Sequence, residues 1–358
     1  MGGVRAPVTF TSSVFEPFDR GVELGERFQA EIASTVASYR RLFATRAGGT
    51  FDLELWADRA WEAIETSSPV YAEEIRGIAE GAARPVHEIA AVNARTELLV
   101  AANPSLVATE CSSVVSLPPG RAPFAVQTWD WYHAMSDGWF HWRIPHPDGR
   151  VVETVTEFGM LAKIGVNEYG VGVMLNMLHH RNDAVRAEEP TVGYPVHLLS
   201  RRILDEARTF ADAWEIAQAA TSASTSLTVL DRSGAAATIE LFPGGPGRLD
   251  PVDGVLVRTN HFLSPEGQGG CLAAMVSDST LIRHKKLVEA FAAAPPSTPH
   301  DVLETMTDHE EGVGGICCHP DPAMHPALRT RTLATVVIDV ANARLAVSAD
   351  GPCGHRDP

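Results

Sequence analysis

Cys111 stands where the character of the sequence changes. About one hundred residues with helical spacing precede it, and the run SSVVS at 112–116 that follows has the composition of a β-strand. A thiol attacks as the thiolate, so its ordinary pKa of about 8.5 must be lowered or a base must be supplied. A buried structural thiol is the alternative, and it is the commoner role of cysteine.

Two kinds of base are compatible with this position. One of the 14 histidines could lie near Cys111 in space, although no local signature supports a papain-like arrangement. If the chain is cut directly before Cys111, the new α-amine has a pKa near 7.7–8.0 and can serve as the base for its own side chain. A cysteine at the first position of a strand, behind a helical segment and a short linker, fits this second arrangement.

Asp130 lies among aromatic residues in the run QTWDWY at 127–132, directly after a predicted strand. An unpaired buried carboxylate is costly, so the run is either a surface turn or part of a functional site. Four of the seven tryptophans fall at positions 129, 131, 139 and 142. We expect a substrate pocket with aromatic walls, and a heavily packed edge of the core is the alternative. The pocket residues would be Trp129, Trp131, Tyr132 and Trp139.

Two further side chains follow or precede predicted strands. Asn260, in the run RTNHF at 258–262, could donate its amide to an oxyanion, although turn formation is the commoner use of asparagine. Arg329, in the run LRTRTL at 328–333, could neutralise a carboxylate or a reacting acyl group. A solvated charge on an edge strand is the alternative for Arg329.

Metal and nucleotide motifs are weak or absent from the sequence. His309, Cys317, Cys318, His319, Cys353 and His355 are possible soft ligands, but their spacing matches neither C-x2-C nor H-x3-H. We therefore expect no metal. The chain has no G-x-G-x-x-G after a strand, no P-loop and no G-x-S-x-G motif, so a dinucleotide site and a serine hydrolase elbow are not expected.

The elements that must position these residues follow from the hydrophobic periodicity. Helical spacing covers 20–45, 52–66, 69–82 and 86–101, and returns at 194–207, 209–220, 277–292 and 300–307. Strand patterns cover 112–117, 123–129, 139–145, 151–157, 160–166, 171–177, 226–231, 236–242 and 253–258, with a hairpin at 331–340 and 343–348. Strands in runs, rather than alternating with helices, predict an α+β or layered sandwich fold.

Charge and composition exclude several classes of partner. The formal net charge of −16 disfavours nucleic acid and anionic membranes. No apolar run approaches the roughly 18 residues of a membrane span, and residues 1–21 lack the apolar region of a signal peptide. The five cysteines do not form a disulfide framework pattern, so we expect a cytoplasmic protein.

Six segments, in order and at approximate spacing, resemble the acyl-coenzyme A:6-aminopenicillanic acid acyltransferase (isopenicillin N acyltransferase) family of N-terminal-nucleophile hydrolases, peptidase family C45. The segments are EEIRGIAEGA at 73–82, NARTE at 93–97, ECS at 110–112, QTWDW at 127–131, TNHF at 259–262 and RTRTL at 329–333. They are spread from residue 73 to residue 333, so the resemblance runs over nearly the whole chain.

This resemblance implies a four-layer αββα sandwich of antiparallel sheets, made as a precursor that cuts itself between Glu110 and Cys111. Residues 1–110 would become a helical small subunit and 111–358 a catalytic large subunit, and the two would stay associated as one domain. Cys111 would be the nucleophile in both self-cleavage and turnover, with its α-amine as base. Asp130 would orient the site and assist processing, Asn260 would be the oxyanion donor, and Arg329 would hold the charge balance or a substrate carboxylate.

The resemblance also implies an amidohydrolase or N-acyltransferase of secondary metabolism. It would act on a small amide or acyl thioester through an acyl-Cys111 thioester. No cofactor is expected, and acyl-coenzyme A is a possible co-substrate. A choloylglycine- or ceramidase-like amidase, and an unprocessed, catalytically silent binder of a small molecule, are the alternatives. The best-known fungal members have glycine before the cysteine, whereas this chain has Glu110. Glutamate adopts strained backbone geometry less easily than glycine, so the rate of self-cleavage stays an open question.

Overall fold

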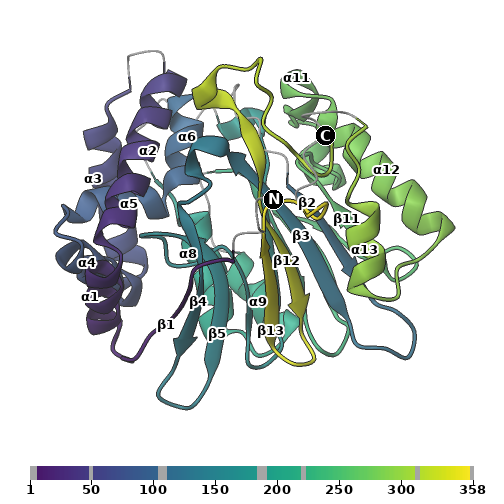
Figure 1. Ribbon diagram of the computed structural model, residues 1–358, viewed down its shortest axis with the longest axis horizontal. Coiled ribbons are helices and arrows are strands. Elements are labelled where there is room, and N and C mark those ends of the chain that lie inside the picture. Colours follow the sequence, from purple (N-terminus) through teal and green to yellow (C-terminus); the bar gives the residue numbers. More distant parts are fainter. Residues whose placement is uncertain are drawn as a thin grey trace.

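The computed structural model describes residues 6–47, 51–103, 111–183, 192–218, 223–310 and 315–354. Glu110, on one side of the predicted cleavage site, lies outside these residues. The described residues before Cys111 are mostly helical and gather on one side of the molecule (Figure 1). These helices are α1 (Pro17–Arg27), α2 (Gln29–Ala47), α3 (Leu53–Ser67), α4 (Pro69–Gly81), α5 (Val86–Asn93) and α6 (Arg95–Ala102).

Two predicted helices are each divided in the structure. The predicted helix at 20–45 is broken at Phe28, whose backbone has φ −128° and ψ 34°. The predicted helix at 86–101 is broken at Ala94, with φ −105° and ψ 24°. The apolar spacing continues through both breaks, so the periodicity could not show them.

Helices α1 and α4 pack backbone to backbone through four glycines. A Cβ atom added at Gly77 would lie 2.0 Å from the carbonyl oxygen of Phe18, and one added at Gly21 would lie 2.2 Å from that of Glu74. Gly25 and Gly81 are enclosed in the same way, one turn further along each helix. The glycines of the 73–82 segment are therefore needed for this close helix contact, because any side chain would push the helices apart.

The strands form two sheets. The larger has the order β1-β4-β5-β6-β7-β8-β9-β10, in which only the β1–β4 pair is parallel, among the described strands. Its strands are β1 (Thr9–Thr11), β4 (Trp139–Pro145), β5 (Val151–Glu157), β6 (Ile164–Asn167), β7 (Gly172–Met177), β8 (Thr225–Leu230), β9 (Ala236–Leu241) and β10 (Gly247–Leu249). The smaller sheet is antiparallel throughout, with the order β11-β2-β3-β12-β13. Its strands are β2 (Ser112–Ser116), β3 (Phe124–Tyr132), β11 (Val255–Arg258), β12 (Thr330–Asp339) and β13 (Arg344–Ala349).

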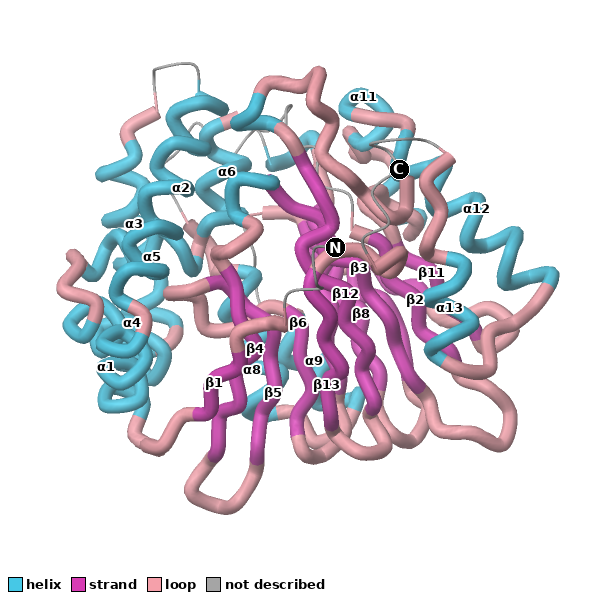
Figure 2. The backbone as a smooth tube through the Cα atoms, viewed as in Figure 1, coloured by secondary structure: helices cyan, strands magenta, loops and turns pink. Residues whose placement is uncertain are grey.

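Helices cover the outer face of each sheet, and the sheets contact each other. Helix α8 (Val196–Glu206) packs on β6 and β7, and α9 (Phe210–Ala217) packs on β8 and β9. Helix α12 (Ser279–Ala293) packs on β11, and α13 (Pro299–Thr305) packs on β3. Strands β2 and β12 of the smaller sheet meet β7 and β6 of the larger. Figure 2 shows the strands lying between the helices of the two sides, which confirms the predicted αββα layering.

Several details differ from the prediction. Strand β3 continues to Tyr132, three residues beyond the predicted end, so the run 127–132 is central strand and not a surface turn. Strand β6 begins only at Ile164. Short helices that were not expected are α10 (Pro265–Gln268), α11 (Ala273–Val276) and the 3-10 turns His133–Met135 and Pro326–Leu328. No helix of the described ranges is long and apolar enough to cross a membrane.

Candidate active site

Cys111 directly precedes β2, which lies between β11 and β3 in the smaller sheet. Its side chain is buried, and its Sγ lies 3.8 Å from the backbone oxygen of Asp130 on β3. The carbonyl oxygen of Cys111 accepts hydrogen bonds from Nδ2 of Asn176 on β7 (3.1 Å) and from Nη1 of Arg283 on α12 (3.0 Å). Three layers of the fold therefore hold this residue.

The Arg283 guanidinium is the centre of this arrangement. It is fully buried, and its Nη1 also donates to Oγ of Ser112 (2.8 Å). Its Nη2 donates to Oδ1 of Asn260 (3.2 Å), and its Nε donates to Oγ of Ser279 one turn earlier on α12 (3.1 Å). A planar fork with five donors suits such a junction. One cation thus ties Cys111 to Asn260.

Asn260 follows β11 and keeps one amide proton for a further acceptor. Its Nδ2 donates to the carbonyl oxygen of Met177 (3.0 Å), and its backbone N–H donates to Oγ1 of Thr280 (2.8 Å). An asparagine amide has two N–H donors, and within the described residues the second makes no hydrogen bond. The side chain is therefore held in place with one donor available.

Asp130 lies within β3, fully buried, in register with Thr332 of β12. Burial, and next the nearby carboxylate of Asp130, raise the pKa of the Cys111 thiol to about 12, although the cations of Lys163 and Arg283 act in the opposite direction. A thiol with such a pKa is protonated near neutral pH. Cys111 therefore needs a base before it can attack.

A buried charged network is centred on Glu157. Glu157 at the end of β5 accepts hydrogen bonds from Nζ of Lys163 (2.5 Å), from Nε of Arg95 (3.1 Å) and from the hydroxyl of Tyr39. Burial, and next the cation of Arg95, lower the pKa of Lys163 to about 7, against the effect of Glu157. The charges of Lys163 and Cys111 affect each other's titration, so this network contributes to the electrostatics of the site. No sequence motif pointed to Lys163 or Glu157.

The NARTE segment on α5 and α6 fastens the helical part of the chain to the rest. Every polar side chain of Asn93, Arg95, Thr96 and Glu97 makes a buried hydrogen bond to a residue after Cys111. The partners, in that order, are Gly159 and Leu161, Glu157, His197 and Val196. These contacts can keep the two predicted pieces together without a peptide link between them. The division at Cys111 itself stays a prediction.

Comparison with known proteins identifies the family. A sequence profile of the acyl-coenzyme A:6-aminopenicillanic acid acyl-transferase family matches residues 118–353. The 40 kDa form of acyl-coenzyme A:6-aminopenicillanic-acid-acyltransferase from Emericella nidulans is 30% identical over 257 residues, which are 70% of this chain and 68% of that protein. The chain belongs to this acyltransferase family. The family assignment confirms the predicted enzyme class, which transfers acyl groups to or from amide nitrogen.

Two solved structures are similar to the chain at a lower level. Penicillin V acylase from Agrobacterium tumefaciens has a TM-score of 0.42 and 12% identity, covering 67% of this chain and 83% of its own. A variant of conjugated bile acid hydrolase from Clostridium perfringens has a TM-score of 0.43 and 11% identity, covering 67% and 92%. The family profile matches residues 118–353, which include Asp130 and Asn260 but not Cys111. The match assigns no role to single residues, so the roles of Cys111, Asp130 and Asn260 stay predictions.

The structure does not place Arg329 with these residues. Its guanidinium donates to the backbone oxygens of Met324 (3.0 Å) and Pro322 (2.7 Å) in its own loop. The neighbouring Arg331 forms an ion pair with Asp350. In this structure Arg283, and not Arg329, is the arginine that contacts Cys111. The expected role of Arg329, in the charge balance or in binding a substrate carboxylate, stays a prediction.

The predicted pocket residues are packed into the core around cations. The ring of Trp129 lies 3.5 Å from Nζ of Lys163 and edge-on to Trp139, with centroids 6.2 Å apart. Arg95 lies over Trp131 at 4.0 Å, and Tyr132 bonds to Arg46. Trp139 also lines a cavity of about 160 Å³. The packed-core alternative therefore accounts for Trp129, Trp131 and Tyr132 in this structure, and their contact with substrate stays a prediction.

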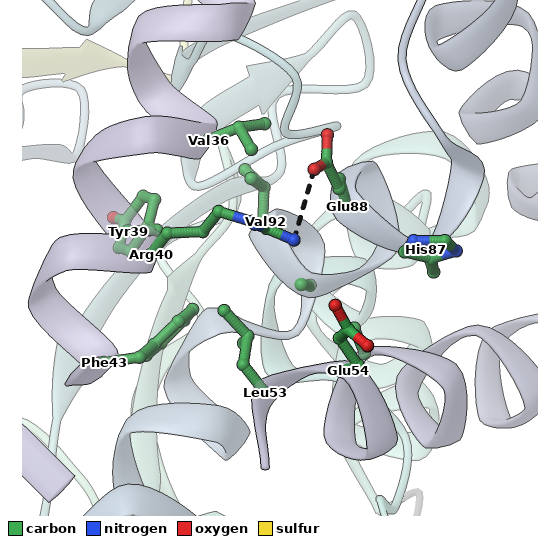
Figure 3. A pocket seen from close by; sticks show the side chains of 11 residues that line it. Val36, Tyr39, Arg40, Phe43, Leu53, Glu54, His87, Glu88 and Val92 are labelled. Carbon is green, nitrogen blue, oxygen red and sulfur yellow. Dashed lines mark ion pairs between the residues drawn. The ribbon is translucent and has the colours of Figure 1, made fainter. Parts of the chain in front are cut away.

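A small pocket lies among the N-terminal helices. It lies between α2, α3 and α5, where Arg40 and Glu88 form an ion pair of 3.4 Å across it (Figure 3). Its volume of about 20 Å³ has room for about one water molecule. Of its lining residues, Tyr39 also donates to Glu157 in the buried network described above.

Proposed function

We propose that this acyltransferase family member works through an acyl thioester on Cys111 and matures by cutting the Glu110–Cys111 bond. The observation that carries the proposal is the buried Arg283 guanidinium, which joins the carbonyl of Cys111 to the side chain of Asn260. It holds the proposed nucleophile and the proposed oxyanion donor in a fixed relation. Precise relative placement of this kind is what a nucleophilic site requires.

The state of the thiol supports self-cleavage as the source of the base. In the uncut chain the pKa of Cys111 is raised to about 12, mainly by burial. Cleavage creates an α-amine with a pKa near 7.7–8.0, which can take the thiol proton of the same residue. In self-cleavage the Sγ attacks the carbonyl carbon of Glu110, the thiol proton passes to the amide nitrogen of Cys111, which leaves as the amine, and water hydrolyses the thioester. The carboxyl group of Glu110 ends the released piece.

Turnover would follow the same chemistry with an external acyl group. The Sγ adds to the acyl carbon, the amine or thiol of the substrate leaves with the proton, and the acyl group remains on Cys111 as a thioester. Water or an amine then attacks this thioester and restores the thiol. The second N–H of Asn260 is the donor that we assign to the oxyanion, and loss of one such donor typically costs about 100- to 1000-fold in rate.

The name of the Emericella relative supports two substrate classes for this chain. An acyl-coenzyme A would be the donor and a small amine the acceptor, or an N-acyl amine would be hydrolysed. No cofactor has a part in either reaction. None of the five cysteines is in a disulfide, and proteins of a reducing compartment rarely have disulfides. This supports the cytoplasmic location that we propose. We also propose a role in secondary metabolism.

Intact mass of the purified protein tests the proposal most directly. We expect two pieces that break at Glu110–Cys111, one uncut chain for Cys111→Ala, and wild-type cleavage for the control Cys271→Ala. A panel of acyl-coenzyme A thioesters and N-acyl amines, with and without an acceptor amine, then separates transferase from hydrolase. An uncut wild-type chain whose Cys111 resists thiol reagents would contradict the proposal, as would full activity of Cys111→Ala.

A further inference from the structure

Four potential metal ligands meet away from Cys111. They are His309, Cys317, His319 and Cys353, and their ligand atoms all lie within 4.8 Å of one another. They come from three segments: the turn after α13, the loop before β12 and the tail after β13. Cys317 is buried, His319 and Cys353 are half-buried, and His309 is exposed.

Four of the six distances among these atoms are close to the edges of a coordination tetrahedron. The two sulfurs of Cys317 and Cys353 are 3.4 Å apart, and the Nε2 atoms of His309 and His319 are 3.1 Å apart. The Nε2 of His319 lies 3.7 Å from Sγ of Cys317 and 3.5 Å from Sγ of Cys353. With Zn–S near 2.3 Å and Zn–N near 2.0–2.1 Å, tetrahedral ligand atoms lie about 3.3–3.8 Å apart.

We propose that these four side chains bind one zinc ion in a closed structural site. Two thiolates and two imidazoles are a ligand set that favours zinc over the hard cations, which prefer oxygen. All four ligands come from the protein, so no position is left for a substrate, and the site is not catalytic. The proposal does not depend on the role of Cys111.

The backbone around Cys317 is built to admit its side chain. Its N–H donates to the carbonyl oxygen of Asp308 (3.1 Å), beside the ligand His309. A Cβ atom at Gly351 would lie 2.3 Å from the Sγ of Cys317, so a side chain at position 351 would displace this ligand. Gly351 thus lets the tail that carries Cys353 approach closely.

The site would fasten two loops to β12 beside the candidate active site. Thr332 of β12 donates its N–H to the oxygen of Cys318 (2.9 Å) and accepts a hydrogen bond at Oγ1 from the N–H of Cys318 (3.0 Å). Thr332 is in register with Asp130 of β3. A zinc ion bound by Cys317 and His319, on either side of Cys318, would therefore stabilise β12, the strand that pairs with β3 at Asp130.

The sequence alone could not identify this site. Seven residues separate His309 from Cys317, one separates Cys317 from His319, and 33 separate His319 from Cys353. Common structural zinc sites take their ligands in close pairs such as C-x2-C or H-x3-H. Only the fold brings the tail to the loop, so the expectation of no metal rested on spacing.

Metal content and cobalt spectroscopy test the proposal. Protein purified without chelator should carry about one zinc ion per chain, measured by elemental mass spectrometry. The variants Cys317→Ser, Cys353→Ser and His319→Ala should lose this zinc. The matched control Cys318→Ser should keep its zinc, because the Sγ of Cys318 faces Thr330 at 3.6 Å and not the cluster. Cobalt added to metal-free wild type should give the intense visible absorption of a tetrahedral site with thiolate ligands.

Three results for the wild type and the ligand variants would overturn the proposal. They are wild-type protein that takes up neither zinc nor cobalt, zinc that is retained by Cys317→Ser and Cys353→Ser together, and a Cys317–Cys353 disulfide in freshly purified protein. If the ligand variants do not fold, the cobalt titration of the wild type and of Cys318→Ser decides the question. Loss of zinc from the control alone would also contradict the assignment.

Discussion

The buried guanidinium of Arg283 donates a hydrogen bond of 3.0 Å to the carbonyl oxygen of Cys111, although Arg283 lies 172 positions further along the chain. Arg283 lies on α12, in the outer helical layer, and Cys111 precedes β2 in the sheet that this layer covers. The contact fixes the backbone of the candidate nucleophile from outside the sheet. It also places a permanent positive charge beside a thiol whose pKa burial raises to about 12.

We expect Arg283→Met to lower kcat of the acyl-transfer reaction by about 100-fold or more, because Cys111 and Asn260 lose a common anchor and the site loses a cation. Self-cleavage should slow in parallel. The measurements are steady-state kinetics and the fraction of cut chain by intact mass. The control is Arg329→Met, which should change kcat by only a few-fold, since that side chain bonds to its own loop.

The comparison between these two arginines decides which one serves the site. A large loss of kcat in Arg329→Met with a folded chain, and a small one in Arg283→Met, would contradict the geometry described above. Circular dichroism and gel filtration of both variants would show whether either loss reflects misfolding. A partial return of kcat in Arg283→Lys would indicate that charge, and not only the forked geometry, matters.

We expect Glu110→Gly to raise the first-order rate of self-cleavage by several-fold. Glycine enters strained backbone conformations at lower cost than glutamate, and an acyl shift from nitrogen to sulfur needs such a conformation. The rate is measured by intact mass at intervals after rapid purification. Glu110→Ala is the control and should cleave at close to the wild-type rate, and an equal rate in all three chains would exclude strain at position 110 as the limiting factor.

We expect Gly77→Ala to destabilise the protein by about 1–3 kcal/mol or more, because its Cβ would lie 2.0 Å from the backbone oxygen of Phe18 and would force α1 away from α4. Urea unfolding measures the change. The matched control is Gly269→Ala, where a Cβ meets nothing within 4 Å and where a change within about 0.5 kcal/mol is expected. Equal effects at the two positions would contradict the tight packing of these helices.

Much of the fold could be predicted because its elements are amphipathic. Strands β4 and β5 begin and end where the alternation indicates, and α3 has nearly the bounds predicted from its spacing. The end of β3 was misjudged because Asp130 interrupts the apolar pattern. In the structure that carboxylate is fully buried in the strand, and buried charges of this kind are found mainly at functional sites.

The parts of the site that lie far apart in sequence could not be predicted. Arg283 belongs to a helix with no recognisable motif, and its spacing of four from Ser279 is common in helices. Glu157, at the end of β5, bonds to Lys163 in the segment after this strand and to Arg95 of α6. Only the folded chain brings these three side chains together. The resemblance of the RTRTL segment to the family points to Arg329 instead, and sequence does not show where a side chain at a strand entrance points.

The stability of the protein should depend on pH through Glu97. Its Oε1 accepts a hydrogen bond of 2.8 Å from the backbone N–H of Val196. Burial raises the pKa of Glu97 from its usual value of 4.5 to about 7. The contribution of this group to stability is therefore fully present below pH 4.5 and is lost as the pH rises through about 7, because the unfolded chain ionises first. Glu97→Gln keeps an acceptor for Val196 and cannot ionise, so it should gain up to about 3 kcal/mol relative to wild type between pH 5 and pH 8. Urea unfolding at both pH values measures this gain. The control Glu26→Gln, at an exposed position, should show no gain. A Glu97→Gln chain with the wild-type pH dependence would show that Glu97 does not stay protonated in the folded protein.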